Sequence, residues 1–332
     1  MAHAVQSPEI KPGVVIVLQG GQGVGKGFFI NTFGHLFGSH YVASAEIENF
    51  VGRFNSILMD KLLVFLDECF WGGDRRVASK LKAMITEPSH TIEKKGVDQF
   101  SIRNYLRFLI ASNDPWVIHA ERDERRYFVL EVSDAYQNNR PYFQKIKTQM
   151  EEGGYEAFLH HLQTYDLSGF DVGKFPRTPH QLEQKFKSMS VVERFIFERL
   201  TEGCLHPDDS FWDGQIEKEK LYTCYCETVK QSGIGKSNWS GEFGKQVLKM
   251  IPSIQTKKIT NPSGKRCALY LLPPLEECRK SFETYFHAEG MIEWDKGEVM
   301  VSPSPNERDE DVSIFFDTTI EEDEEEYSLS FF

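Results

Sequence analysis

Short apolar runs separated by polar turns recur along the first 130 residues. Residues 14–18, 62–66 and 106–111 are almost continuously apolar, which is typical of strands buried on both faces of a parallel sheet. Residues 26–37 and 76–86 instead place apolar side chains at helical spacing. Strands that alternate with helices predict an α/β fold whose core is a parallel sheet.

Three further elements are predicted in this half: a strand, a helix and a second strand, at residues 40–45, 46–58 and 127–132. The second half predicts mainly helices. The next segments predict helices at residues 134–166, 191–200, 218–232 and 240–250, and two strands at 254–258 and 266–272. Pro176 and Pro179 mark a linker.

Two helices followed by a hairpin resemble a winged helix. The hairpin would present four basic residues to a DNA backbone: Lys257, Lys258, Lys265 and Arg266. A module that only packs or recruits proteins is the open alternative.

A glycine-rich loop joins the first predicted strand to the first predicted helix. Gly20, Gly25 and Lys26 satisfy the pattern G-x4-G-K of a P-loop. Backbone N–H groups of such a loop point at phosphate oxygens, and the lysine reaches the β- and γ-phosphates. The residues expected to bind nucleotide are Gly20, Gly21, Gln22, Gly23, Val24, Gly25, Lys26 and Gly27. Gly27 stands where a hydroxyl would bind Mg²⁺, and a plain glycine-rich turn is the alternative.

Polar residues end the next two apolar runs. Asp67 and Glu68 follow one run, and Asn113 follows the other. Because open parallel sheets bind ligands beyond the carboxyl ends of their strands, we expect these side chains at a site. Asp67 would hold Mg²⁺, Glu68 would polarise an attacking water, and Asn113 would bond the γ-phosphate or that water. A helix-capping acid and a turn-forming asparagine would also explain these residue types.

Two pairs of basic residues are candidates for phosphate contacts. A hairpin predicted at residues 90–102 carries Lys94 and Lys95 at its tip, where they would contact DNA phosphates without reading sequence. Arg125 and Arg126 precede a strand, and their planar guanidinium groups suit the charge of a phosphoryl transition state. A solvated hairpin end and structural ion pairs are the alternatives.

The negative charge is concentrated near the C-terminus. The formal net charge is −12, and residues 303–332 contain eleven acidic residues and one arginine, which leaves about −2 for residues 1–302. A nearly neutral body permits local basic patches. The segment from residue 303 lacks apolar periodicity and ends in Phe331 and Phe332, so a disordered acidic tail is expected.

Cysteine usage and hydropathy indicate an intracellular protein. The six cysteines form no C-x-x-C pair and have no histidine at zinc spacing, which favours reduced thiols. No apolar run approaches the ~18 residues of a membrane span. Residues 1–11 lack a signal-peptide core. We therefore expect a cytoplasmic protein with no membrane partner.

The ordered motifs resemble superfamily 3 helicases of the AAA+ class. The likeness is carried by GGQGVGKG at 20–27, LLVFLDE at 62–68, LIASN at 109–113 and DERRYF at 123–128. From residue 13 to about residue 199, the chain is more closely similar to the helicase portion of phage and prophage primase–helicases. GRFNSIL at 52–58, DECFWGGD at 67–74 and KGVDQF at 95–100 carry this closer match. Residues 191–286 resemble the winged-helix-like C-terminal module of poxvirus-type relatives.

This resemblance implies a replicative DNA helicase of phage or mobile-element type in a bacterial host's cytoplasm. It implies a hexameric ring that binds ATP and Mg²⁺ between subunits and moves on single-stranded or forked DNA with 3′→5′ polarity. Glycine after the P-loop lysine is frequent in that family. The implied roles are phosphate ligand for Lys26, metal ligand for Asp67, base for Glu68, γ-phosphate sensor for Asn113, trans-acting finger for Arg126 or Arg125, and channel loop for Lys94 and Lys95.

Two other functions stay open at this point. One is a DNA-stimulated AAA+ ATPase that loads or remodels replication complexes without unwinding; the other is a non-catalytic replication adaptor. The acidic tail would dock a polymerase, a primase or a single-strand-binding protein. Alternatively, it would only solubilise the chain or would inhibit it by occupying the chain's own basic channel. Relatives of the resembled kind usually carry a primase–polymerase region before this module. Only twelve residues precede residue 13, so we expect no priming chemistry in this chain, whether it is a fragment or a stand-alone product.

The expected organisation is an AAA+ P-loop ATPase core with a parallel sheet, a helical extension, and a winged-helix-like α+β domain. The expected boundaries are a lead-in at 1–12, the core at 13–135, the extension and linker at 136–185, the winged-helix-like domain at 186–290 and the tail at 291–332.

Overall fold

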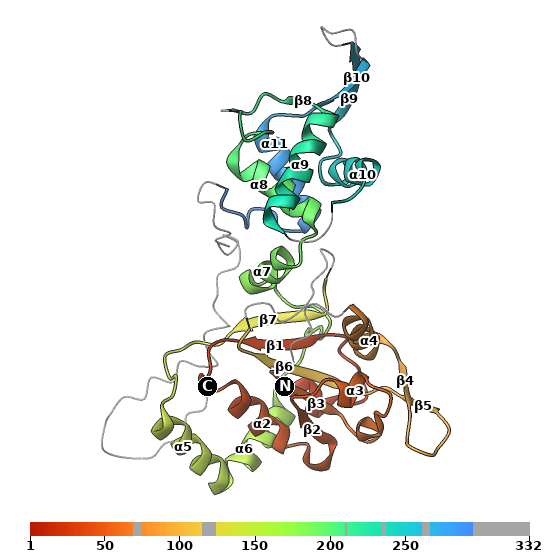
Figure 1. Cartoon of the computed structure of the whole chain (residues 1–332). Coiled ribbons are helices and arrows are strands. Elements are labelled where there is room, and N and C mark those ends of the chain that lie inside the picture. Colours follow the sequence, from red (N-terminus) through yellow and green to blue (C-terminus); the bar gives the residue numbers. More distant parts are fainter. Residues whose placement is uncertain (69–74, 115–123, 210, 234–236, 261–265, 295–332) are drawn as a thin grey trace, which may run out of the picture.

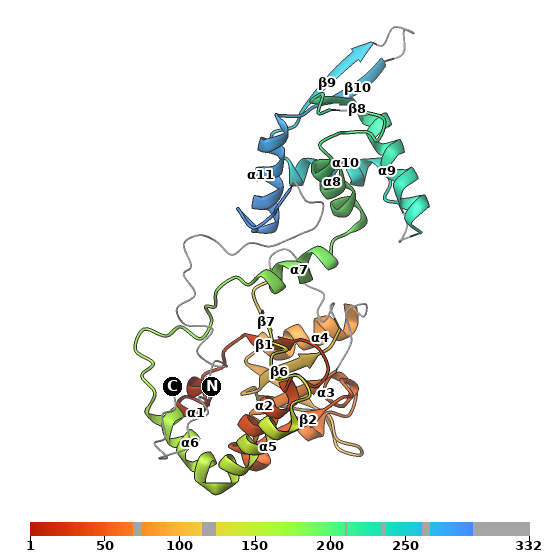
Figure 2. The same ribbon diagram turned by 90° about the vertical axis from the view of Figure 1, so that its left-hand side faces the viewer.

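The computed structural model describes residues 1–68, 75–114, 124–209, 211–233, 237–260 and 266–294. A lower part contains a five-stranded sheet, and an upper part is built mainly of helices (Figure 1). Helix α7 (Pro179–Lys187) lies between the two parts (Figure 2). Cys69, Lys265, the motif residues 69–74 and the acidic tail fall outside the described residues. Among the helices described, none is long and apolar enough to cross a membrane.

The lower part is organised around a parallel sheet, as predicted. Its strands are β1 (Val15–Gln19), β2 (Tyr41–Ser44), β3 (Leu63–Asp67), β6 (Arg107–Ser112) and β7 (Tyr127–Glu131), in the spatial order β2-β3-β6-β1-β7. Every residue of β6 is buried, which explains its apolar sequence. The register pairs Gln19 with Ser112 and Asp67 with Ala111, so the carboxyl ends of β1, β3 and β6 meet at one edge.

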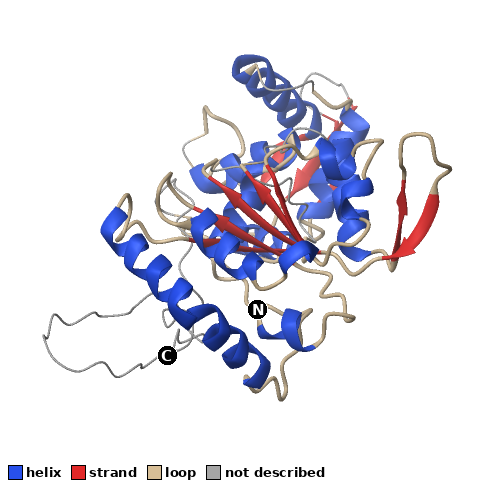
Figure 3. Ribbon diagram, turned by 90° about the horizontal axis from the view of Figure 1, so that it is seen from below, coloured by secondary structure: helices blue, strands red, loops and turns tan. Residues whose placement is uncertain are grey.

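Alternate side chains of the strands enter two apolar layers, one on each face of the sheet. Val64 and Leu66 of β3 belong to one layer, together with side chains of α4 (Arg75–Thr86). Leu63 and Phe65 belong to the other layer, together with Ile30 of α2 (Lys26–His35). Helices therefore cover both faces, and this arrangement confirms the predicted α/β class (Figure 3).

The helix predicted over residues 46–58 is wrong as one element. The structure has only the short helix α3 (Glu48–Val51) and the 3₁₀ turn η2 (Ser56–Leu58) there. Gly52 ends α3 in an extended conformation, with φ −69° and ψ −175°. Phe50, Val51 and Leu58 are nevertheless buried, so the apolar spacing reflects inward side chains rather than a continuous helix.

The N-terminal residues are tied to the sheet and to a helical extension. Helix α1 (Ala2–Gln6) lies against α6 (Tyr155–Thr164), where the Gln6 side-chain amide donates to the Leu162 and Tyr165 carbonyls at 2.7 and 2.8 Å. Arg107 at the start of β6 donates to the carbonyls of Ser7, Pro8 and Ile10. The extension consists of α5 (Arg140–Gln149), a π-helical turn (Met150–Gly154) and α6.

The predicted linker at Pro179 is instead the first turn of α7. Proline suits the first helical position because its missing N–H would have no partner there. Thr178 caps this helix by accepting from the Gln181 N–H, and its hydroxyl donates to the Val129 carbonyl at 2.6 Å. The Gln181 side-chain amide donates to the Tyr127 carbonyl at 3.2 Å, so α7 is fixed to strand β7.

The upper part has its own apolar core. The helices α8 (Val191–Glu202), α9 (Lys218–Ser232), α10 (Ser240–Met250) and α11 (Leu275–Phe286) surround that core. The strands β8 (Gln215–Glu217), β9 (Gln255–Thr260) and β10 (Arg266–Leu271) form an antiparallel sheet in the order β8-β10-β9. The three helices and two strands predicted here are confirmed, whereas β8 and α11 were not predicted.

Candidate functional site

The loop between β1 and α2 depends on two glycines. Gly23 and Gly25 have φ values of +83° and +101°, a conformation that residues with a side chain rarely adopt. A Cβ atom at position 25 would lie 2.6 Å from a ring carbon of Phe143, and one at position 23 would overlap the Asn138 side chain. Backbone curvature and close packing therefore both require glycine.

Residues 137 and 138, which directly precede α5, hold this loop from outside. The Asn138 N–H donates to the Gly23 carbonyl at 3.0 Å, and the Gln137 side-chain amide donates to the Gln22 carbonyl at 2.8 Å. Asn138 itself has a φ of +58°, which asparagine tolerates better than most residues. The sequence analysis missed these contacts, since a polar run before a helix does not indicate what it touches.

Lys26 occupies the mouth of the loop. Its Nζ donates to the carbonyls of Gly20 and Gly21 at 2.8 and 2.7 Å and to Asn113 Oδ1 at 2.6 Å. The residue is only 7% exposed. Burial lowers the pKa of the Lys26 ammonium group, and the negative charges of Glu68 and Asp67 oppose that shift. Three donors in a partly desolvated ammonium group make a strong anion ligand.

Asn113 connects Lys26 to the acidic pair. Its Nδ2 donates to Glu68 Oε1 at 2.5 Å, while its Oδ1 accepts from Lys26. Glu68 has a φ of +52°, and its N–H donates to the Ala111 carbonyl at 2.9 Å. A left-handed glutamate is strained backbone, which concentrates at functional sites. The structure thus brings together the first residue of α2 and the residues that follow β3 and β6.

The carboxylate of Asp67 lies near Glu68 and Lys26, whose charges shift its pKa. Burial raises the pKa of Asp67, the charge of Glu68 raises it further, and Lys26 lowers it. Mg²⁺ prefers oxygen ligands and keeps several waters, so one or two carboxylates can hold it. No cluster of three or more His, Cys, Asp and Glu residues occurs in the described part of the chain, so water and phosphate oxygens would complete the shell.

Gly27 is not imposed by packing. A Cβ atom there would meet only Asn31 Nδ2, at an ordinary 3.9 Å, so a hydroxyl side chain would fit. One turn later, the Asn31 amide donates to the Gly27 carbonyl and accepts from the Tyr41 hydroxyl, both at 2.7 Å. Burial and the nearby Asp67 raise the pKa of Tyr41 to about 12, so Tyr41 is a neutral donor here.

The two arginines lie at the opposite edge of the sheet. Arg126 immediately precedes β7, and its carbonyl accepts from the Val15 N–H at the start of β1. Its guanidinium donates to the buried Glu124 at 3.0 Å, whereas Arg125 is exposed. Neither arginine lies at the end of β1 that carries the glycine loop.

The predicted basic hairpin is confirmed as a structural element. Strands β4 (Ser89–Ile92) and β5 (Phe100–Arg103) pair antiparallel and project away from the rest of the lower part (Figure 3). Lys94 and Lys95 are exposed in the turn, where Gly96 has a φ of +78°.

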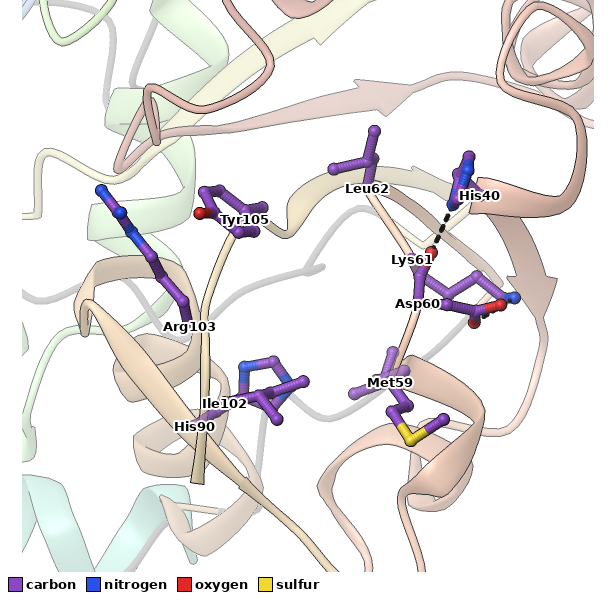
Figure 4. A pocket seen from close by; sticks show the side chains of 10 residues that line it. His40, Met59, Asp60, Lys61, Leu62, His90, Ile102, Arg103 and Tyr105 are labelled. Carbon is purple, nitrogen blue, oxygen red and sulfur yellow. Dashed lines mark hydrogen bonds and ion pairs between the residues drawn. The ribbon is translucent and has the colours of Figure 1, made fainter. Parts of the chain in front are cut away.

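A cavity of about 200 Å³ lies away from the glycine loop (Figure 4). It is lined by residues near the amino ends of β3 and β6, including His40, Leu62, His90 and Tyr105. His40 Nδ1 lies 2.6 Å from the Asp60 carbonyl oxygen. None of the residues that line this cavity is a predicted site residue.

Comparisons with known proteins give a limited but consistent result. A family model described as a family of unknown function (DUF5906) matches residues 18–126. A DNA primase-polymerase from Nitratiruptor phage NrS-1 is 23% identical over 234 residues, which cover 67% of this chain and 31% of that protein. The chain therefore spans about a third of the length of that relative.

Two solved structures of the NrS-1 C-terminal region share the fold. The first has a TM-score of 0.61 at 20% identity and covers 82% of this chain and 70% of that one. The second has a TM-score of 0.59 at 20% identity and covers 82% and 69%. Both are apo structures of the same region, so they show a common arrangement of helices and strands rather than an activity.

These comparisons correct the functional expectation from the sequence. The relative is a DNA primase-polymerase, so the expectation of an AAA+ helicase that binds ATP to drive unwinding is wrong. Neither the superfamily 3 nor the poxvirus-type resemblance is supported by the matches. What stands is a likeness to a phage replication protein, and glycine-loop motifs did not distinguish it from a helicase.

Proposed function

We propose that this chain is part of a DNA replication protein of the primase–polymerase kind, and that the carboxyl edge of its sheet binds a nucleoside triphosphate with Mg²⁺. The observation that carries the proposal is the hydrogen-bonded line from Lys26 through Asn113 to Glu68, beside Asp67. Nucleoside triphosphates are the substrates of primases and polymerases, so a triphosphate site fits a relative with that name. The proposal does not depend on which base is attached.

Each residue of the proposed triphosphate site has a proposed role. Phosphate oxygens accept from the N–H groups of residues 20–27 and from Lys26, which then exchanges the Gly20 and Gly21 carbonyls for phosphate. Asp67 binds Mg²⁺ through a carboxylate oxygen. Glu68 would accept the proton of the attacking hydroxyl, and Asn113 would donate to a phosphate oxygen. In nucleotidyl transfer this hydroxyl forms its bond to the α-phosphorus of the triphosphate, and pyrophosphate leaves.

Arg126 and Arg125 can serve a triphosphate only in a second copy of the chain. Four residue steps along β1, from Val15 to Gln19, measure roughly 13 Å, which is too far for Arg126 to reach the loop of its own chain. A finger role for either arginine therefore rests on self-association, which we propose without a fixed number of subunits.

We further propose DNA as a partner in the host cytoplasm. Lys94 and Lys95 would contact phosphates without sequence preference, since both are exposed on a projecting turn. The acidic sequence at 303–332 is proposed to recruit a polymerase, primase or single-strand-binding protein by its charge.

Isothermal titration with a nucleoside triphosphate and Mg²⁺ tests the proposed site. Lys26→Ala removes a charge-assisted donor to phosphate, and we expect about 10- to 100-fold weaker binding. Lys147→Ala removes a 58% exposed lysine side chain on α5 and is the matched control, which should bind like the parent chain.

Equal affinity of Lys26→Ala and Lys147→Ala would refute the proposed site. The site would also be refuted if none of the common ribonucleoside and deoxynucleoside triphosphates bound to the parent chain. Inorganic triphosphate should compete, whereas the nucleoside alone should not, because the proposed contacts are to phosphate oxygens. Circular dichroism of each variant checks that the fold is kept.

A further inference from the structure

Positive charge is concentrated in one segment of the upper part. Residues 228–275 contain eight lysines and arginines but a single acidic residue, Glu242, in a chain whose formal net charge is −12. This segment includes helix α10 and the β9–β10 hairpin. Such a local excess of positive charge is typical of a surface that binds a polyanion.

The described basic side chains share one end of the molecule. On α10, Phe243, Val247 and Met250 face the core, which leaves Lys245 and Lys249 exposed on the outer face. The β9–β10 hairpin, which lies above α10 in Figure 1, contains three more exposed cations. By strand alternation and register, Lys258 and Arg266 lie on the face that carries Tyr270, which reaches α10, whereas Lys257 lies on the opposite face. We call the basic surface the set of Trp239, Lys245, Lys249, Lys258 and Arg266.

In the described part of the chain, these charges have no ion-pair partner. Among the ion pairs that the described ranges contain, none involves Lys245, Lys249, Lys257, Lys258 or Arg266. By contrast, Arg199 and Arg279 in the same part pair with Glu202 and Glu276 at 2.8 Å. The basic surface therefore keeps its attraction for an external anion.

Trp239 is exposed but held in place beside these charges. It is 65% exposed, although tryptophan normally covers apolar area. Its ring lies against the first turn of α10, because a Cβ atom at Gly241 would overlap the indole. Lys245 Nζ lies 6.0 Å from the ring centre. The indole thus contacts Gly241 through its six-membered ring, and most of its surface remains open to a partner.

The supports of Trp239 come from the core of the upper part. The Asn238 carbonyl accepts from the Tyr222 hydroxyl at 2.9 Å, and the Asn238 N–H donates to the Tyr225 hydroxyl at 3.1 Å. Helix α10 approaches β10 closely, since a Cβ atom at Gly244 would lie 2.9 Å from the Tyr270 hydroxyl. The segment before Trp239 and the hairpin are therefore fixed on one rigid support.

We propose that the basic surface is a second nucleic-acid site, which binds single-stranded DNA with an unpaired base stacked on Trp239 and with the lysines on the flanking phosphates. A pinned aromatic ring beside unpaired cations is the combination that binds single strands without sequence preference. Bases in a duplex are already stacked on one another, so the exposed indole favours a single strand. The inference goes beyond the triphosphate site, because it requires neither nucleotide nor Mg²⁺.

Fluorescence anisotropy with a labelled oligothymidine, in a buffer without nucleotide or Mg²⁺, tests this site. Trp239→Ala should weaken binding about 5- to 100-fold, the usual effect of losing one stacked base. Phe211→Ala is the matched control, because Phe211 is 69% exposed in the same part but lies outside the basic segment. It should bind like the parent chain.

Lys258→Glu with Arg266→Glu tests the phosphate contacts, because both side chains lie on one face of the hairpin. We expect binding to weaken at least tenfold. The slope of log affinity against log salt concentration should become shallower by about 0.7 for each phosphate contact that is lost. Lys280→Glu, a charge reversal at an exposed position of α11, should have a much smaller effect.

Three outcomes would overturn the proposal: affinity unchanged by Trp239→Ala, equal losses for Lys280→Glu and the hairpin pair, or a duplex bound as tightly as the single strand. Because the assay contains no nucleotide, a negative result would not contradict the triphosphate site. A negative result at the triphosphate site would likewise not affect this assay. The same substitutions are also measured in a chain that carries Lys94→Ala and Lys95→Ala. This comparison separates the basic surface from the β4–β5 hairpin as a DNA contact.

Discussion

Asp67 carries the acid–base behaviour of the candidate site. Burial and the charge of Glu68 raise its pKa, and only Lys26 opposes them. Protons and Mg²⁺ compete for the same carboxylate oxygens. Since the pKa lies above that of a free aspartate, protonation begins at a higher pH than usual, and metal binding is lost as pH falls through that raised value.

Asp67→Asn tests this competition. In the parent chain, Mg²⁺-dependent triphosphate binding should weaken as the pH is lowered from 8 toward 4, and the variant should bind weakly at all pH values without that slope. Because the fold disfavours the charged form of Asp67, the variant should also melt at a higher temperature near neutral pH, and the difference should vanish in acid. Identical pH profiles for the two chains would exclude Asp67 as the ligand.

The sequence could predict residues whose role follows from local spacing. Lys26 follows its glycines, and Asp67, Glu68 and Asn113 end apolar strands, so their convergence followed from the parallel order of the strands. Residues brought in from other segments carried no such signal. Those that surround the loop without having been predicted are Asn31, Tyr41, Gln137, Asn138 and Phe143.

At the scale of elements, the projecting hairpin is the clearest separate unit. It is anchored by the Arg53–Glu93 ion pair at 2.7 Å and by the buried Ile92, whereas its tip contacts nothing in the described structure that would require lysine. A tip held away from the core suits contact with a partner rather than packing.

Lys94→Ala with Lys95→Ala should therefore leave the fold and triphosphate binding unchanged and weaken DNA binding. Loss of two phosphate contacts predicts a salt slope lower by about 1.4 for single strands. Filter binding at several salt concentrations measures this slope, and Lys145→Ala with Lys147→Ala on α5 is the control pair. A slope that stays the same would place the DNA elsewhere.

The sequence predicted elements well where periodicity and caps agreed. Helix α10 was predicted with its observed bounds. Helix α8 is capped by Ser190, which bonds reciprocally with Glu193, and is followed by Gly203 in a left-handed conformation. Prediction failed where a local break or cap signal was given too little weight. Gly52 breaks the helix expected at 46–58, and Thr178 turns a proline-rich linker into α7.

At the scale of the whole molecule, two cores carry two proposed sites. Helix α7 connects them and contacts the sheet beside the glycine loop, where the Gln184 side-chain amide lies 3.3 Å from Gln19 Oε1. The helicase function expected from the sequence is wrong at this scale, because it concerns the whole protein. One α/β fold hosts many activities, so a glycine-rich loop on a parallel sheet does not show the activity of the whole protein.

The central claim is that the strand ends of β1, β3 and β6 form one triphosphate site. The most direct measurement is a crystal structure with Mg²⁺ and a non-hydrolysable nucleoside triphosphate. We predict phosphate oxygens within hydrogen-bond distance of Lys26 Nζ, Mg²⁺ held through Asp67, and the Lys26–Gly20 and Lys26–Gly21 hydrogen bonds replaced. Triphosphate bound at another place, with Lys26 still bonded to both carbonyls, would contradict the account.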